Sequence, residues 1–147
     1  MVQLREITKD NLEDVLSLQV SEKQKEFVSS TAHSLAQAYV YKGKAFPFAI
    51  YADDALVGFI MMGYYEERKQ YTLWKFLIDK SHQNKGYGRA ALVQGIAYLR
   101  DEFGVNEVYT GVLPGNEVAK RLYVSVGFAQ TGLVEYGMEE MKYQAEE

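Results

Sequence analysis

Residues 83–90 read QNKGYGRA and lie where an expected strand turns into an expected helix. The first backbone N–H groups of a helix lack intrahelical partners, and together with the helix dipole they favour an anion. Gly86 and Gly88 would let the backbone approach a phosphate closely, and Lys85 and Arg89 add positive charge nearby. The stretch therefore fits a pyrophosphate cradle, although an ordinary tight strand-to-helix turn would also use glycine. It matches neither the GxxxxGK(S/T) loop nor the three-glycine dinucleotide fingerprint.

Hydrophobic periodicity predicts the elements that would position this loop. Asp10 and Glu13 predict a capping box for a first, short helix. An Ala-Asp-Asp turn between two apolar runs predicts a hairpin. The expected elements are strand 2–5, the short helix, helix 35–41, strands 46–51, 55–65 and 71–79, helix 86–103, strand 106–113, helix 116–126 and a β-hairpin over 128–143.

The order of these elements predicts an α/β chain with a mixed sheet. Strand 71–79, helix 86–103 and strand 106–113 form a βαβ unit, so the two strands should be parallel and joined by a right-handed crossover. The other connections are short enough for hairpins, which makes the rest of the sheet antiparallel, with helices on both faces. A length of 147 residues suits one domain over 1–147.

Composition excludes several classes of function. The formal net charge is −4 and no block of like charge occurs, so nucleic acid is not an expected partner. The chain has no cysteine, and His33 and His82 do not form a zinc spacing, so no metal site is expected. No apolar segment approaches the roughly 20 residues of a membrane span, and the first residues do not read as a signal peptide. These features predict a soluble, cytoplasmic protein.

Two motifs together resemble one known family. Gln83-x-x-Gly86-x-Gly88 is similar to the first signature of the GNAT superfamily of N-acetyltransferases. The second signature, N-x-x-A-x-x-L-Y-x-x-x-G-F, is matched by Asn116 to Phe128. The element order also resembles the GNAT fold over nearly the whole chain, including its central splayed pair of parallel strands. The resemblance implies acetyl-CoA as the cosubstrate and an acyltransferase that acetylates an amine.

The resemblance also implies which residues hold the coenzyme. The loop would bind the pyrophosphate, and the backbone of one strand would bind the pantetheine arm as an added strand. An N–H on that strand would steady the oxyanion. The coenzyme-binding residues expected on this basis are Phe76, Leu77, Ile78, Gln83, Asn84, Lys85, Gly86, Tyr87, Gly88, Arg89, Asn116 and Lys120.

Three of the expected site residues also have structural interpretations. Tyr123 occupies the family's general-acid position, but it also belongs to an apolar stripe that would pack in the core. Asn116 is a good helix N-cap as well as a pantetheine contact. Lys120 is either a ligand of the adenosine phosphates or a solvated helix charge.

The acceptor is the least specified part. LQVSEKQKEFV (18–28), the hairpin 46–63 and WKFLID (74–79) resemble bacterial spermine/spermidine (diamine) N-acetyltransferases. The expected substrate-binding residues are Glu22, Glu26, Trp74 and Glu135. Some GNAT enzymes place a glutamate base on the strand where this chain has Lys75, so we expect proton removal through ordered water instead.

The predicted reaction is direct transfer of the acetyl group to a primary amine of a polyamine in a ternary complex. The alternatives are another amine (a protein N-terminus, a lysine or an amino sugar) or a coenzyme-A-binding sensor without catalysis. The family resemblance also suggests a homodimer.

Overall fold

The computed structural model describes residues 1–25, 27 and 29–145. Along the chain it contains β1 (Val2–Arg5), α1 (Leu12–Leu16), η1 (Glu22–Gln24), α2 (Thr31–Val40), β2 (Ala45–Ala52), β3 (Ala55–Tyr65), β4 (Gln70–Ile78), η2 (Lys80–His82), α3 (Tyr87–Phe103), β5 (Glu107–Val112), α4 (Glu117–Val126), β6 (Phe128–Glu135) and β7 (Met138–Gln144). Apart from the two short 3₁₀ helices, η1 and η2, this is the predicted order of elements.

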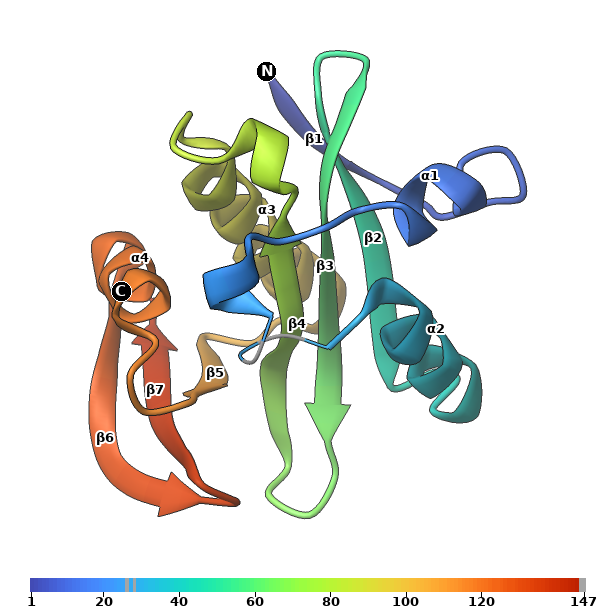
Figure 1. The fold of residues 1–147 in the computed structure, drawn as a ribbon. Helices are drawn as coiled ribbons and strands as arrows, with labels where there is room; N and C mark the ends of the chain where they lie inside the picture. The colour runs from blue at the N-terminus through green and yellow to red at the C-terminus, as the bar shows by residue number, and fades with distance from the viewer. Residues whose placement is uncertain (26, 28, 146–147) are drawn as a thin grey trace.

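The strands form one seven-stranded sheet in the order β1-β2-β3-β4-β5-β7-β6 (Figure 1). Every neighbouring pair is antiparallel except β4 and β5, which are parallel because α3 carries the chain across the sheet between them. Helices α1 and α2 cover one face and α3 covers the other (Figure 1). The predicted mixed sheet with helices on both faces is confirmed.

The parallel strands separate soon after they pair. Their register contains two pairs, Thr72 with Tyr109 and Leu73 with Thr110. The Thr110 hydroxyl donates to the Leu73 carbonyl at 3.1 Å, at the last point where the strands meet. Directly beyond it, Trp74 is the extra residue of a bulge between β3 and β4. A bulge bends its strand, so β4 turns away from β5 and a gap opens between them.

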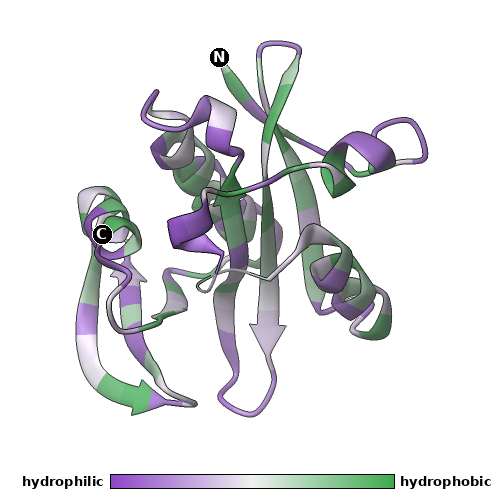
Figure 2. Cartoon of the chain, viewed as in Figure 1, coloured by the Kyte–Doolittle hydropathy of each residue, from purple (hydrophilic) through white to green (hydrophobic). Residues whose placement is uncertain are grey.

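Strand β3 is almost continuously apolar because it contributes side chains to the core on both faces of the sheet. Phe59 and Met61 pack under α1 and α2, while Ile60 and Met62 pack under α3. All four side chains are buried, since successive residues of a strand face opposite sides of a sheet that is covered on both. Figure 2 shows this central apolar band and the polar turn that ends it. Because β3 pairs with β4, this buried strand supports one side of the gap between β4 and β5.

Two local expectations were wrong. Asp10 and Glu13 do not form a capping box, because Asn11 precedes α1 and its Oδ1 accepts from the Thr8 N–H at 2.8 Å. Helix α2 begins at Thr31 rather than at 35, because the Ser30 hydroxyl caps it by accepting from the His33 N–H at 3.1 Å. The polar residues of that first turn hid the start of the helix from a periodicity analysis.

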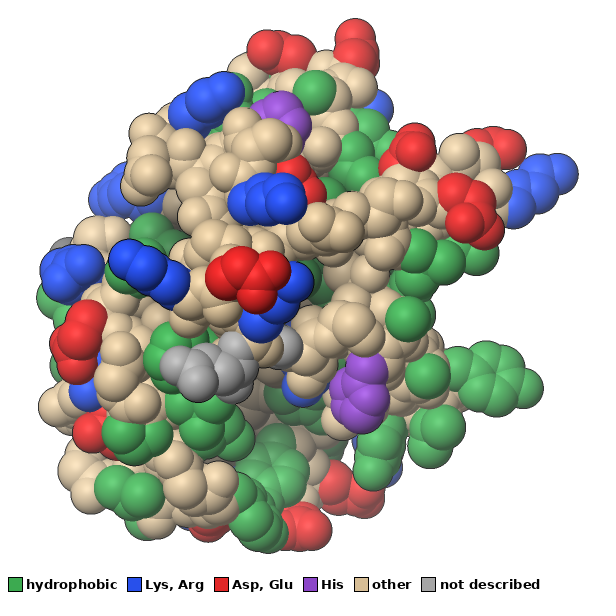
Figure 3. Space-filling view, in the orientation of Figure 1, with side chains coloured by type: hydrophobic (Ala, Val, Ile, Leu, Met, Phe, Trp, Pro, Cys, Tyr) green, Lys and Arg blue, Asp and Glu red, His purple; other side chains and the backbone are tan. Residues whose placement is uncertain are grey.

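Charged side chains of both signs are interspersed on the face drawn in Figure 3.

Within the described part of the chain, no helix is long and apolar enough to span a membrane. The same residues contain no group of three or more histidine, aspartate or glutamate side chains suited to a metal ion.

Candidate active site

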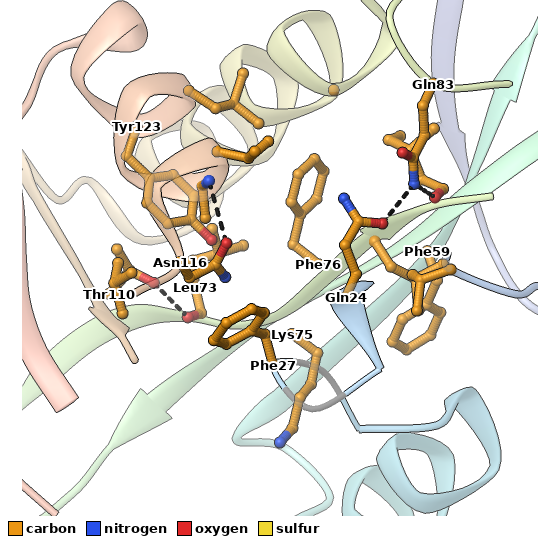
Figure 4. Close-up of a pocket in the computed structure, with 18 of the residues that line it drawn as sticks. Gln24, Phe27, Phe59, Leu73, Lys75, Phe76, Gln83, Thr110, Asn116 and Tyr123 are labelled. Atoms are coloured by element: carbon orange, nitrogen blue, oxygen red, sulfur yellow. Dashed lines mark hydrogen bonds between the residues drawn. The ribbon is translucent and has the colours of Figure 1, made fainter. Parts of the chain in front are cut away.

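The gap between β4 and β5 is a cavity of about 590 Å³. Its walls come from both strands, the loop before α3, helix α4 and the segment between α1 and α2 (Figure 4). These segments lie far apart in sequence, and the divergence of the two strands brings them around one space. Most of the predicted coenzyme-binding residues line this cavity, and Lys85 and Lys120 do not.

The two glycines of the loop have different structural roles. Gly86 is the N-cap of α3 and has a φ of 81°, a left-handed conformation that favours glycine. A Cβ added there would meet no protein atom within 4 Å, so Gly86 borders open space. A Cβ added to Gly88 would lie 3.2 Å from the Phe76 ring and 3.4 Å from the Leu122 side chain, so Gly88 lets α3 pack closely. The open space beside the first turn of α3 fits a phosphate.

Gln83 holds the loop in place. Its Nε2 donates to the Ile78 carbonyl at 2.9 Å and to Gln24 Oε1 at 2.8 Å. The first bond ties the loop to the end of β4, and the second ties it to η1 (Figure 4). Gln24 is therefore a cavity residue that sequence analysis missed, since no motif marks it.

The backbone of β4 presents only some of its polar groups to the gap. The Asp79 N–H donates to the Val57 carbonyl of β3 at 2.8 Å. Backbone groups alternate between the two edges of a strand, so those of Leu77 also face β3 and those of Phe76 and Ile78 face β5. Of the three predicted strand positions, Phe76 and Ile78 thus have the geometry to bind an added extended chain.

Tyr123 both packs in the core and faces the cavity. Its side chain is buried, and its ring lies 5.5 Å from that of Phe128. Burial raises the pKa of Tyr123 to about 12, while the adjacent Thr110 hydroxyl acts in the opposite direction. The phenol therefore stays protonated at neutral pH and can donate a proton into the cavity. Figure 4 shows it beside Asn116 and Thr110.

Asn116 and Lys120 have structural partners. Asn116 Oδ1 accepts from the Ala119 N–H at 3.4 Å and so caps α4, and its side chain also lines the cavity. Lys120 Nζ lies 2.5 Å from Glu139 and 3.7 Å from Glu117. The bond to Glu139 raises the pKa of Lys120. These contacts favour an ion-pair role for Lys120 over phosphate binding.

A second cavity, of about 690 Å³, lies on the other side of the point where β4 and β5 separate. It is bordered by the end of α2, the β3–β4 turn and the β6–β7 hairpin. Six residues line both cavities and define what we call the neck: Leu73, Trp74, Lys75, Thr110, Gly111 and Met138. The two cavities are therefore adjacent, with these six residues as their common boundary.

The second cavity has an acidic and aromatic wall. Arg68 Nη1 lies 3.1 Å from Glu135 and its Nη2 lies 3.9 Å from Glu140. The Tyr65 hydroxyl donates to Glu67 at 3.0 Å and to Glu135 at 3.3 Å. Its hydrogen bond with Tyr136 and burial raise the pKa of Tyr65. Carboxylates and aromatic faces both attract a cation, and the four glutamates of this lining outnumber its three basic residues, Lys44, Arg68 and Lys75.

The predicted acceptor residues divide into three groups. Trp74 and Glu135 line the second cavity. Glu22 lies on η1 outside both linings, where it pairs with Lys25 at 2.7 Å. Glu26 lies outside the described residues. Arg68, Tyr109, Glu140 and Thr110 were missed, because only the turns and the β5–β7 pairing bring them to this wall.

A splayed parallel strand pair, a glycine loop that opens a helix and a buried tyrosine lie at one cavity, which is the arrangement expected of an acyl-coenzyme A transferase. Residues 12–128 match the model of the acetyltransferase (GNAT) family, and the chain belongs to that family. It is an acetyl-CoA-dependent N-acetyltransferase. The open cradle beside Gly86 fits the coenzyme.

Two curated relatives are similar over almost their whole length. The chain is 32% identical to a probable spermine N(1)-acetyltransferase of Bacillus subtilis subsp. natto, over 95% of each chain. It is 31% identical to a spermine/spermidine N(1)-acetyltransferase of Bacillus subtilis, again over 95% of each.

Solved structures share the fold. A spermidine N-acetyltransferase from Vibrio cholerae, in complex with CoA and spermine, superposes with a TM-score of 0.77 at 19% identity, covering 97% of this chain and 95% of that one. An N-acetyltransferase from Thermoplasma acidophilum, in complex with coenzyme A, gives a TM-score of 0.73 at 15% identity, covering 98% and 99%.

Proposed function

We propose that this chain, working as one domain, transfers the acetyl group of acetyl-CoA to a primary amine of a spermidine- or spermine-like polyamine. The observation that carries the proposal is the meeting of two cavities at the neck, one beside an anion-binding loop and one with an acidic, aromatic wall. The names of the two Bacillus relatives support the same acceptor. The amine and the thioester would meet at the neck in a ternary complex.

The first cavity, between β4 and β5, would be the donor cavity, which binds and orients acetyl-CoA. The first-turn N–H groups of α3 would hold the diphosphate, and Arg89 would add charge. The edge of β4 at Phe76 and Ile78 would hold the arm in an extended conformation. Holding the thioester beside the amine would lower the barrier, because it replaces a collision by a fixed geometry. The thioester is the acetyl donor in this scheme, and the protein forms no covalent intermediate.

Tyr123 is the proposed acid. The amine nitrogen attacks the carbonyl carbon, the C–S bond breaks, and the Tyr123 hydroxyl gives its proton to the departing thiolate. A pKa of about 12 keeps that proton in place until the thiolate forms. The same apolar surroundings also make the thiolate more basic, which offsets the higher pKa of the phenol.

The second cavity would be the acceptor cavity, which selects the amine. Glu135, held by Arg68 and Tyr65, would bind a remote ammonium while the reacting nitrogen lies at the neck. An alkylamine of pKa near 10.4 is neutral in about one molecule in 2,500 at pH 7, which corresponds to roughly 4.6 kcal/mol. Ordered water in this cavity would carry the excess proton to solvent.

An amine panel with acetyl-CoA and a thiol-release readout tests the proposal. Spermidine or spermine should have a higher kcat/KM than a lysine peptide, a peptide N-terminus or an amino sugar. A better rate with one of those amines would refute the polyamine acceptor and leave the acetyltransferase. Coenzyme binding without turnover of any amine would indicate a coenzyme-A sensor.

A further inference from the structure

The neck contains one amine of the protein itself. Of the six residues that line both cavities, Lys75 alone carries a nucleophilic nitrogen. The Thr110 hydroxyl is already engaged with the Leu73 carbonyl. Lys75 also directly precedes Phe76, the position on β4 proposed to hold the pantetheine arm. A lysine side chain is therefore attached to the boundary between the two cavities, where the proposed function places acetyl transfer.

The surroundings of Lys75 do not fix it as an ammonium ion. Its Nζ donates to the Ser29 hydroxyl at 3.0 Å, and Ser29 is a neutral partner. None of the ion pairs among residues 1–25, 27 and 29–145 includes Lys75. Burial lowers the pKa of Lys75, which enlarges the neutral, nucleophilic fraction at a given pH.

We propose that Lys75 is an internal acceptor, acetylated by the chain's own active site when acetyl-CoA is bound and no external amine occupies the second cavity. The proposal rests on the donor site described under Proposed function. The Nζ lone pair attacks the thioester carbonyl carbon and the C–S bond breaks. Nζ loses one proton to water, the thiolate takes one from Tyr123, and Tyr123 regains its proton from water. Acetyl-CoA is the only co-reactant.

Reaching the thioester requires a change of side-chain conformation. In Figure 4 the Lys75 amine points away from Tyr123, toward the segment before α2. One hydrogen bond to a neutral hydroxyl holds the amine there. The side chain has four rotatable carbon–carbon bonds, so a different rotamer can turn Nζ toward the neck. Tethering then gives this amine a high effective concentration at the thioester.

Acetylation would change the acceptor side of the neck. An amide does not take up a proton, so the modification removes an amine that can become a positive charge near an incoming cationic acceptor. The second cavity, at about 690 Å³, has room for the added acetyl group.

Peptide-resolved mass spectrometry after incubation with acetyl-CoA alone tests the proposal. Lys75 should be acetylated in most chains, well above the exposed Lys9 and Lys69, which report chemical acetylation. Labelling of Lys75 should fall when spermidine is in excess. It should be lost in Gly86→Glu and slowed in Tyr123→Phe, while Lys75→Arg should leave only the background on the exposed lysines.

The outcomes separate this proposal from the proposed function. Unmodified Lys75 overturns the proposal, whether or not spermidine is acetylated in a parallel assay. Equal labelling of Lys75 in wild type and Gly86→Glu also overturns it, because that labelling would be chemical. Enzymatic labelling of Lys75 without turnover of any polyamine would support the internal acceptor and refute the polyamine assignment.

Discussion

The two cavities on either side of the neck are built by different means. The donor cavity is shaped by backbone: the divergence of β4 from β5, the left-handed Gly86 and the first turn of α3. The acceptor cavity is shaped by side chains on turns and a hairpin, such as Arg68 and Glu135. Backbone geometry can bind the same diphosphate and pantetheine in many sequences, whereas a side-chain wall can be exchanged residue by residue. The comparison thus suggests a constant donor site and an adaptable acceptor site.

The largest expected effect lies on the backbone-built side. Gly86→Glu places a side chain and a negative charge where the diphosphate should bind, so the thermal stabilisation by acetyl-CoA should disappear. In wild type that stabilisation should reach about 2.7 kcal/mol at a ligand concentration of 100 times Kd. Melting curves with and without acetyl-CoA measure this stabilisation in the wild type and in the variant.

Gly43→Glu is the matched control. Gly43 also has a φ of 81° and nothing within 4 Å of an added Cβ, but it lines neither cavity. The control should lose a similar amount of intrinsic stability and keep the coenzyme-induced shift. A folded Gly86→Glu protein with the full shift would break the assignment of the donor cavity.

The next effect concerns Tyr123, which lines the first cavity beside Thr110 of the neck. Tyr123→Phe removes a hydroxyl and little volume, so the fold and coenzyme affinity should change slightly. If the phenol protonates the thiolate, kcat and kcat/KM should fall together by about 10²–10⁴-fold. Single-turnover kinetics and a melting curve on the same variant separate this from core packing, which predicts lower stability with an unchanged chemical step.

A smaller effect is expected on the side-chain-built side. Glu135→Gln should lower kcat/KM for spermidine by about 10-fold, since a charge-assisted contact contributes about 1.5 kcal/mol or more. The rate with propylamine, which has no second ammonium group, should hardly change. Glu22→Gln is the control, because Glu22 lies outside both linings, and it should leave both rates unaltered. Equal losses for spermidine and propylamine would argue against a remote-ammonium site.

The smallest effect is the absence of a descending limb in the dependence of kcat/KM on pH. An ordinary tyrosine ionises near pH 10, and burial moves the pKa of Tyr123 upward to about 12. The kcat/KM for spermidine should therefore keep rising to about pH 10 as more acceptor amine becomes neutral, without a descending limb from the acid. A decline that begins below about pH 9 and is absent in Tyr123→Phe would contradict a raised pKa.

The donor side could be predicted from sequence because its signals are local. Glycines, a helix start and a strand lie within 71–103, and their spacing carries the geometry. The two glycines nevertheless serve different needs, and the contact of Gly88 with Phe76 and Leu122 depends on how α3 and α4 pack. The direction in which the backbone of Leu77 points follows from pairing with β3, which the periodicity of a buried strand does not reveal.

The acceptor side was predicted only in part because it has no local signal. From the sequence, Glu22 and Glu135 are equivalent candidates for the acceptor site. Only the fold shows that Glu135 lines the second cavity and that Glu22 lines neither cavity. Arg68 and Tyr65 reach the Glu135 wall from the β3–β4 turn, about seventy residues away along the chain. Such side-chain convergence depends on the strand order, in which β5 lies next to β4 and β7 lies next to β5, and not on any spacing within one element.

A crystal structure of the protein with coenzyme A and spermine tests the central claim most directly. We expect the diphosphate at the N–H groups of 86–89 and the sulfur beside the Tyr123 hydroxyl at the neck. The polyamine should occupy the second cavity, with one end at the neck and a remote ammonium at Glu135. Both ligands in one cavity, or a sulfur directed away from the neck, would contradict the account.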